Sequence, residues 1–159
     1  MSGEARGARP PGTVVIRRVL PATREEVFAA WTDVESMREW MCPSDGHTAE
    51  AQLDPRVGGS YRIVMRDRAG VYEHTGEYLL VEPPAKLVFT WIAKSTNNRP
   101  TIVTVELFPH ERGCELVLTH ERLPEGEIEE RHRGGWEHIA DRLAAHLVRR
   151  QTDGEGRRA

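Results

Sequence analysis

Two histidines, His74 and His120, are the strongest candidates in this chain for contact with a ligand or substrate. Each occupies a position of an alternating strand pattern that faces the apolar side. A buried imidazole needs a hydrogen-bond partner, because an unsatisfied polar group costs ~1 to 3 kcal/mol. Beside a tyrosine, such a histidine could move a proton on a bound substrate or hydrogen-bond with a ligand. Alternatively, each is a core histidine whose partner is a backbone carbonyl or a tyrosine hydroxyl.

Other kinds of site chemistry have little support in the sequence. The chain has seven histidines, but none forms an HxxxH or HExxH pair, and His132 and His138 lie on different faces of a helix. No GxSxG elbow or local cysteine motif is present, so a covalent nucleophile is not predicted. We therefore expect no metal site and no cofactor.

The elements that would position the histidines begin with a strand and two short helices. A β-branched run over 14–20 is typical of a strand, which ends at Pro21 because proline cannot continue a ladder. Thr23 to Glu26 has the TxxE form of a capping box, so a helix is expected to start there. Residues 32–35 repeat the signal, which predicts a second short helix that stops at Cys42 and Pro43.

Short alternating runs separated by turn residues follow from Gly46 to about Glu121, beginning with a short strand near 47–53. Six strands are expected to share one inner face. The predicted inner positions are Tyr61, Ile63, Met65, Tyr72, His74, Gly76, Tyr78, Leu80, Leu87, Phe89, Trp91, Val103, Val105, Leu107, Leu116, Leu118 and His120.

A long amphipathic helix is predicted over 127–150. Its apolar stripe recurs at steps of three and four and consists of Ile128, His132, Trp136, Ile139, Leu143 and Leu147. Strands without crossover helices pair as antiparallel meanders, and such a helix covers one face of their sheet. The predicted fold is therefore α+β, with a curved antiparallel sheet of about six to seven strands wrapped around the long C-terminal helix.

Gly134 and Gly135 lie inside this helical pattern. Each costs about 1 kcal/mol relative to alanine in a helix interior. The pair calls for a reason, such as close approach to a strand or the mouth of a cavity. Alternatively, the regular helix begins only at these glycines.

Length and charge favour one soluble domain over residues 13–150, with disordered segments at 1–12 and 151–159. The 22 basic and 25 acidic side chains give a net charge of −3, and no basic run marks a nucleic-acid site. No stretch is apolar enough for a bilayer span or a signal peptide. We expect a cytoplasmic protein whose Cys42 and Cys114 are reduced thiols, with a single long-range disulfide as the alternative.

Several motifs together resemble a known family over about residues 14–148. They are 18–22 followed by Val27, AWTD at 30–33, Trp40 and Pro43, VGGSYR at 57–62, Gly76, EPPAKLVFTW at 82–91, TIVTVELFPHERGCELVLTHE at 101–121, and the Gly135-Trp136 pair. The chain resembles the START-like (SRPBCC, helix-grip) superfamily, in the branch of the activator of heat-shock-protein-ninety ATPase. The resemblance implies a hydrophobic cavity between the sheet and the C-terminal helix, which relatives use for lipids, polyketides and other apolar molecules.

Three functions are compatible with this resemblance. The first is non-enzymatic sequestration, transport or sensing of a lipid or polyketide-like molecule in the cavity. The second is an enzyme of the cyclase, dehydratase or hydrolase type that uses His74 or His120 with a tyrosine. The third is a stress-related protein-interaction module, although co-chaperone members of the family carry an additional N-terminal domain where this chain has a 12-residue polar leader.

The expected partner is an apolar small molecule, without nucleic acid or membrane insertion, bound by a monomer or weak homodimer. We predict that aromatic, aliphatic and imidazole side chains line its cavity. The candidate ligand-binding residues are Trp40, Tyr61, Ile63, Met65, Tyr72, His74, Tyr78, Phe89, Trp91, Val105, Leu118, His120, Trp136, Ile139 and Leu143.

Overall fold

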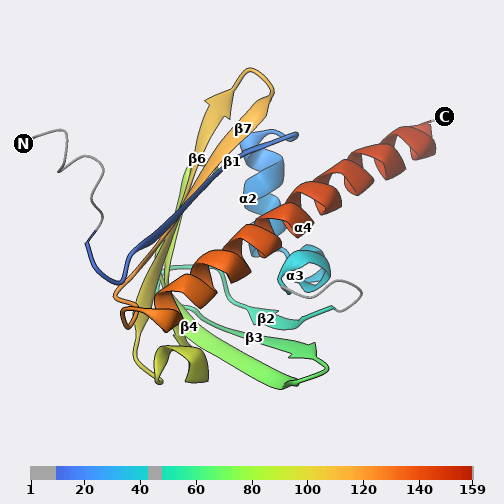
Figure 1. Cartoon of the computed structure of the whole chain (residues 1–159). Coiled ribbons are helices and arrows are strands. Elements are labelled where there is room, and N and C mark those ends of the chain that lie inside the picture. The colour runs from blue at the N-terminus through green and yellow to red at the C-terminus, as the bar shows by residue number, and fades with distance from the viewer. Residues whose placement is uncertain (1–9, 43–47, 159) are drawn as a thin grey trace, which may run out of the picture.

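Seven strands form one antiparallel sheet in the order β1-β7-β6-β5-β4-β3-β2, in a computed structural model that describes residues 10–42 and 48–158. The strands are β1 (Val14–Leu20), β2 (Glu50–Leu53), β3 (Ser60–Asp67), β4 (Gly70–Glu82), β5 (Lys86–Ala93), β6 (Thr101–His110) and β7 (Gly113–Glu121). The helices are α2 (Arg24–Thr32), α3 (Val34–Trp40), the single 3-10 turn η1 (Lys94–Thr96) and α4 (Glu127–Arg158). The sheet curves around α4, and this arrangement confirms the predicted α+β helix-grip fold (Figure 1).

The two short helices start at side-chain caps. Thr23 Oγ1 accepts a hydrogen bond from the Glu26 amide at 3.1 Å, and Glu26 Oε1 accepts one from the Thr23 amide at 3.0 Å. The cap of α3 is Asp33, whose Oδ2 accepts from the Ser36 amide at 2.9 Å. This is one residue later than the repeated TxxE signal suggested, because the Thr32 hydroxyl instead donates to the Phe28 carbonyl of α2.

Alternation along the strands directs one face of the sheet to the core. The pattern is regular throughout β5 and in β6 as far as Leu107, where every second side chain is buried. In β4 a register shift between Tyr78 and Leu80 changes the phase, so that Val81, paired with Leu87, packs on the core. The prediction that Leu80 faces inward was therefore wrong, because the alternation cannot be carried across a bulge.

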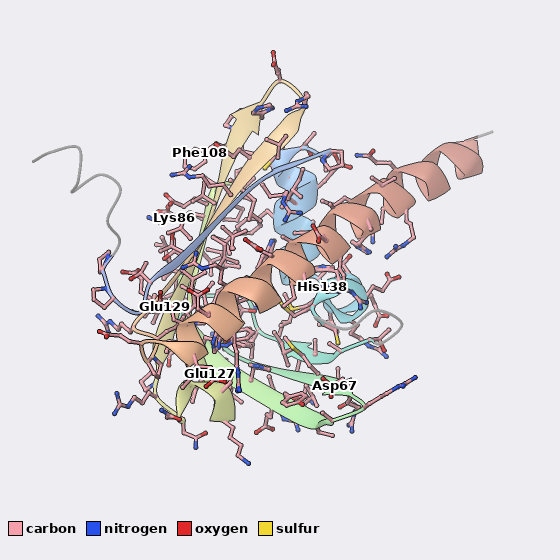
Figure 2. The ribbon with its side chains drawn as sticks, viewed as in Figure 1. Asp67, Lys86, Phe108, Glu127, Glu129 and His138 are labelled. Atoms are coloured by element: carbon pink, nitrogen blue, oxygen red, sulfur yellow. The ribbon has the colours of Figure 1, made fainter. Side chains whose placement is uncertain are left out.

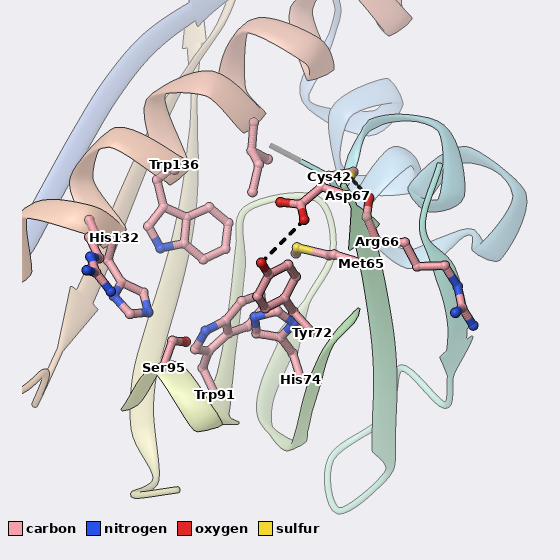
Figure 3. A pocket seen from close by; sticks show the side chains of 13 residues that line it. Cys42, Met65, Arg66, Asp67, Tyr72, His74, Trp91, Ser95, His132 and Trp136 are labelled. Carbon is pink, nitrogen blue, oxygen red and sulfur yellow. Dashed lines mark hydrogen bonds between the residues drawn. The ribbon is translucent and has the colours of Figure 1, made fainter. Parts of the chain in front are cut away.

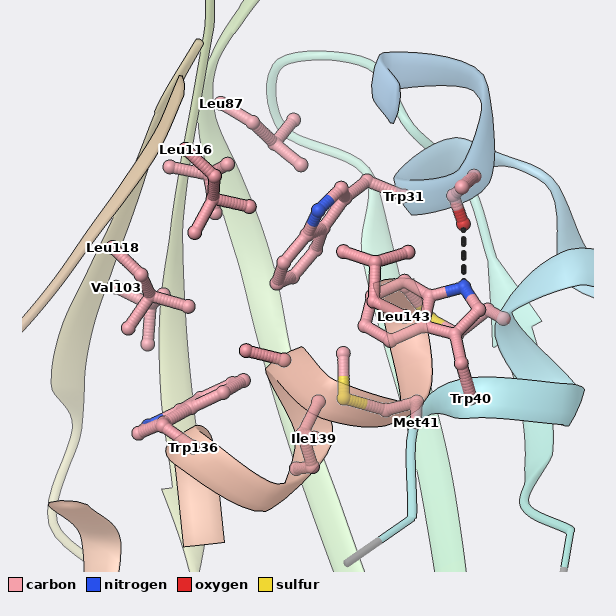
Figure 4. Packing of buried hydrophobic residues seen from close by; sticks show 14 of the residues in the cluster. Trp31, Trp40, Met41, Leu87, Val103, Leu116, Leu118, Trp136, Ile139 and Leu143 are labelled. Atoms are coloured by element: carbon pink, nitrogen blue, oxygen red, sulfur yellow. Dashed lines mark hydrogen bonds between the residues drawn. The ribbon is translucent and has the colours of Figure 1, made fainter. Parts of the chain in front are cut away.

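The core lies between the concave side of the sheet and α4. The predicted helix stripe supplies Trp136, Ile139, Leu143 and Leu147, all of them buried. Trp31 of α2 packs edge-on against Trp40 with ring centroids 4.8 Å apart (Figure 4). The short helices therefore close the end of the core at which α4 crosses α3.

The ends of the chain differ in part from expectation. The helix α4 begins at Glu127 as predicted but continues to Arg158, through the segment for which the sequence predicted an unstructured tail. The Gln151 side chain donates to the carbonyl of Pro21, which holds this part of the helix against the end of β1. Most of the predicted leader and Pro43 lie outside the described residues.

Both cysteines are buried and free, so the expectation of reduced thiols at Cys42 and Cys114 is met in this structure. Within residues 10–42 and 48–158, no helix is long and apolar enough to cross a membrane. The long helix α4 instead carries charged residues on its outer face, among them Glu127 and Glu130 in its first turn.

Candidate ligand-binding cavity

A cavity of about 340 Å³ opens between strands β3, β4 and β5 and the first turns of α4. Its volume lies within the range that small-molecule sites occupy, ~300 to 1,000 Å³. Six predicted ligand-binding residues line it, namely Met65, Tyr72, His74, Trp91, Trp136 and Ile139 (Figure 3). The strand register explains how they meet, because Met65 pairs with Tyr72 and Trp91 lies on the neighbouring strand β5.

The remaining predicted residues lie deeper in the molecule. Tyr61, Ile63, Tyr78 and Phe89 surround a residual space of only about 10 Å³. Trp40, Val105, Leu118, His120 and Leu143 are packed in the core, each at most 3% exposed. Most of the interior behind the sheet is therefore filled by side chains, and the cavity of about 340 Å³ lies towards the N-terminal end of α4.

His120 is held by a buried chain of hydrogen bonds. The Trp136 indole Nε1–H donates to His120 Nδ1 at 2.9 Å, which leaves the proton on Nε2. His120 Nε2 lies 2.7 Å from the Thr101 hydroxyl, which donates onward to the Trp91 carbonyl at 2.6 Å. The pKa of His120 is lowered well below its ordinary value by burial, with smaller effects of His132 and His74.

These hydrogen bonds give His120 a structural role. Both of its ring nitrogens have partners, and its side chain does not line the cavity. The partners are a threonine and a tryptophan, where the core-histidine alternative expected a backbone carbonyl or a tyrosine. The network ties β6 and β7 to α4 and fixes the orientation of Trp136, whose ring forms one wall of the cavity.

His74 is different, because it is buried at the cavity without such a network. It is 7% exposed, its ring packs at a tilt of 38° against Trp91 with centroids 4.5 Å apart, and its Nδ1 has no hydrogen-bond partner among the described residues. Burial lowers the pKa of His74 to about 4, the nearby His132 lowers it further, and the backbone of Ile63 and Tyr72 partly opposes this. The imidazole is therefore neutral at pH 7.

His132 is a cavity residue that was not among the predicted contacts. Its Nδ1 lies 2.8 Å from the Ile128 carbonyl, which can only accept, so Nδ1 carries the proton and Nε2 carries a lone pair. Burial lowers the pKa of His132, and the Ile128 carbonyl partly offsets this. Its place on the apolar helix stripe, four residues before Trp136, was the available signal.

The rim of the cavity carries charges that are already paired. Arg66 bonds to Glu50 at 3.1 Å, and Arg131 bonds to Glu127 at 2.6 Å. The Tyr72 hydroxyl, on a side chain that is 42% exposed, donates to Asp67 Oδ1 at 3.3 Å. The sequence did not single out these rim charges, because ion pairs at the ends of separate elements leave no local pattern.

Gly135 also lines the cavity, together with Cys42 and Ser95. Among the described residues, no strand or side chain lies within 4 Å of an ideal Cβ at either Gly134 or Gly135. The helix is continuous from Glu127, so close approach and a later helix start do not explain the glycines. The cavity-mouth interpretation fits Gly135, whereas Gly134 is exposed and does not line the cavity.

The proton-transfer alternative makes a specific prediction about the geometry of the site. An enzyme using an inward histidine would need it within hydrogen-bond reach of a tyrosine or carboxylate. His74 Nδ1 has no such contact in the described part of the chain, and Tyr72 bonds to Asp67 instead. A pKa near 4 also makes His74 a weak base at pH 7. In the same part of the chain, no three His, Cys, Asp or Glu side chains are grouped so as to hold a metal ion.

Known proteins share this fold and part of this sequence. A protein from Chromobacterium violaceum is 28% identical with a TM-score of 0.75, over 85% of this chain and 96% of that chain. A protein from Rhodobacter sphaeroides is 26% identical with a TM-score of 0.75, over 88% and 96%. DynU16, from the dynemicin biosynthetic locus, shares the fold at 23% identity and a TM-score of 0.72, over 87% of this chain and 48% of that chain.

A comparison with curated proteins finds no match. The family model described as Activator of Hsp90 ATPase homolog 1-like protein matches residues 21–148, which include α2, the sheet from β2 to β7 and most of α4. Since this match covers most of the chain, and the solved structures share its architecture, the chain belongs to the Activator of Hsp90 ATPase homolog 1-like family within the START-like superfamily.

Proposed function

We propose that this protein binds a hydrophobic small molecule, such as a lipid or polyketide-like compound, in the cavity between the sheet and α4. The observation that carries the proposal is the cavity of about 340 Å³, walled by Trp91, Trp136, Met65 and Ile139. Apolar walls with a few placed polar groups are typical of small-molecule sites. Sequestration, transport or sensing would each use such binding without a chemical step.

The interaction-module alternative has less support. A docking surface for a protein needs a contiguous apolar patch of several hundred Å². The large exposed apolar side chains are spread over several parts of the fold, with Val57 before β3, Val71, Tyr72 and Leu79 on β4, Phe108 on β6 and Val148 on α4. Phe108 lies towards the opposite end of the molecule from Asp67 and the cavity rim (Figure 2). Small-molecule binding by a cytoplasmic monomer or weak homodimer therefore remains our proposal.

An amide and indole chemical-shift titration tests this function. Lipids, flavonoid-like compounds and polyketide-like compounds are added in turn to the labelled protein at pH 7. The indole N–H groups of Trp91 and Trp136 should shift and saturate, because both rings line the cavity. The indole of Trp40 serves as an internal control, because its N–H donates to the Ala30 carbonyl in the filled core. No saturable shift with any compound would contradict the proposal.

A further inference from the structure

The polar groups inside the cavity are neutral and incompletely paired. His74 is 7% exposed, and its Nδ1 lacks a partner among the described residues. A neutral imidazole has one N–H to donate and one lone pair to accept with. Nδ1 is shielded from the cavity, so a ligand can reach this ring only at Nε2, which can carry the proton because no acceptor holds one on Nδ1.

His132 determines which kind of atom this must be. Its Nδ1–H is used by the Ile128 carbonyl at 2.8 Å, so its Nε2 can only accept a hydrogen bond. A ligand carbonyl or ether oxygen cannot pair with this nitrogen, because it has no proton to give. A hydroxyl can donate to His132 and also accept from an N–H of His74.

Charge at the rim argues against an ionic ligand. Both arginines of the lining already pair with carboxylates, Arg66 with Glu50 and Arg131 with Glu127. Asp67 accepts from the amides of Ala69 and Gly70 at 2.8 and 3.0 Å. An anionic ligand that leaves water needs a positively charged side chain as its ion-pair partner, whereas a neutral ligand does not.

The walls favour a flat, aromatic body. The ring centroids of Trp91 and Trp136 lie 5.1 Å apart, and the ring of His74 packs at a tilt against the same Trp91 with centroids 4.5 Å apart. Aromatic rings attract one another when their centroids are about 4.5 to 7 Å apart, so a further ring can pack against this group. A planar ring could join this group while its polar substituent reaches the imidazoles, which lie among the same rings in Figure 3.

Resting on the proposed function, we infer that the ligand is a neutral aromatic compound with a hydroxyl group, recognised by His132 as acceptor and His74 as donor. Its ring would lie against Trp91 and Trp136. Phenolic and hydroxylated polycyclic compounds belong to this class. Carboxylates and purely hydrocarbon chains do not.

Four matched probes test the inference at pH 7: 2-naphthol, 2-methoxynaphthalene, naphthalene and 2-naphthoate. Dissociation constants are measured from the indole shifts of Trp91 and Trp136. The naphthol hydroxyl should improve affinity about five- to tenfold over the methoxy compound, which has the oxygen but no donor. In His132→Leu this ratio should fall to about one. In His110→Leu, a histidine of the distant β6–β7 hairpin, the ratio should stay unchanged.

Because the ratio compares two ligands within one variant, general damage to the cavity cancels out. His74→Leu should reduce the ratio as well, but the wild-type protein and His132→Leu decide the question if that variant does not fold. The inference is overturned if 2-naphthoate binds more tightly than 2-naphthol, or if His132→Leu keeps the wild-type ratio. If naphthalene and its methoxy derivative bind but the hydroxyl adds nothing, this inference fails while the proposed function stands. If no probe binds, this inference fails, and the titration with lipids and polyketide-like compounds decides the proposed function.

Discussion

Replacing Gly135 with leucine should fill the cavity without harming the fold. Gly135 lines the cavity, and no described strand or side chain would stand within 4 Å of its new Cβ. The neighbouring Gly134 also has no described strand or side chain within 4 Å of an added Cβ, but it faces solvent and does not line the cavity. Gly134→Leu is therefore a matched control, which changes the same residue type in the same turn of α4.

The expected size of both effects follows from the structure. Removing a glycine from a helix interior should raise the free energy of unfolding by about 1 kcal/mol in each variant. At Gly135, burial of the new side chain should add roughly 1 to 2 kcal/mol, because leucine would leave water for an apolar site. Four added carbons, each near the ~30 Å³ that a water molecule occupies, take up roughly 100 Å³. This is close to a third of the 340 Å³ cavity.

The assay combines urea denaturation with the naphthalene titration. We expect both variants to be more stable than the parent, whereas only Gly135→Leu should bind naphthalene at least tenfold more weakly. Higher stability together with weaker binding would mean that the leucine occupies the cavity. Misfolding would instead lower both stability and binding. Equal binding by all three proteins would show that the ligand site lies elsewhere, and a destabilised Gly135→Leu would show that the space beside α4 is not open.

Three further predictions concern stability. Thr101→Val removes the buried hydroxyl next to His120 Nε2, so the free energy of unfolding should fall by about 1 to 3 kcal/mol in urea; an unchanged value would contradict the role of this network. The pKa of His74, about 4 in the folded protein against 6.5 ordinarily, makes its contribution fully present above pH 6.5 and lost as the pH falls towards 4. Between pH 7 and 4.5 this loss should amount to about 2 to 3 kcal/mol and be absent from His74→Gln, and an equal loss in both proteins would argue against it. Arg18→Ala removes an ion pair with Asp141, which is 66% exposed, so it should cost less than about 1 kcal/mol, and a larger cost would mean that the pair holds α4 to β1.

The sequence predicted most of the fold because its signals are local. The cap at Thr23, the alternation in β5 and β6, and the helix stripe around Trp136 each involve residues close along the chain. The bulge after Tyr78 could not be predicted in the same way, because a single extra residue reverses the two faces without an identifiable residue type. After Tyr78, the pairing of β4 with β5 determines which side chains of β4 face the core.

The cavity was less predictable than the fold. Inner-face alternation identified Met65 and Trp91, and the helix stripe identified Trp136. Alternation also selected residues such as Leu118, which pack where no space remains. Cavity volume depends on how far the curved sheet stands from α4, and alternation carries no information about that distance. The partner of His120 was unpredictable for a related reason, since Thr101 meets it only through the register of β6 and β7.

Contacts between bound naphthalene and the labelled protein, measured as intermolecular nuclear Overhauser effects, would locate the ligand. If the cavity binds apolar molecules, the ring protons of naphthalene should show contacts to Met65, Trp136 and Ile139, which line it. Contacts should be missing to Phe108 and Val57, which are exposed elsewhere on the surface. Contacts confined to those exposed residues, or none at saturating ligand, would contradict a binding cavity between the sheet and α4.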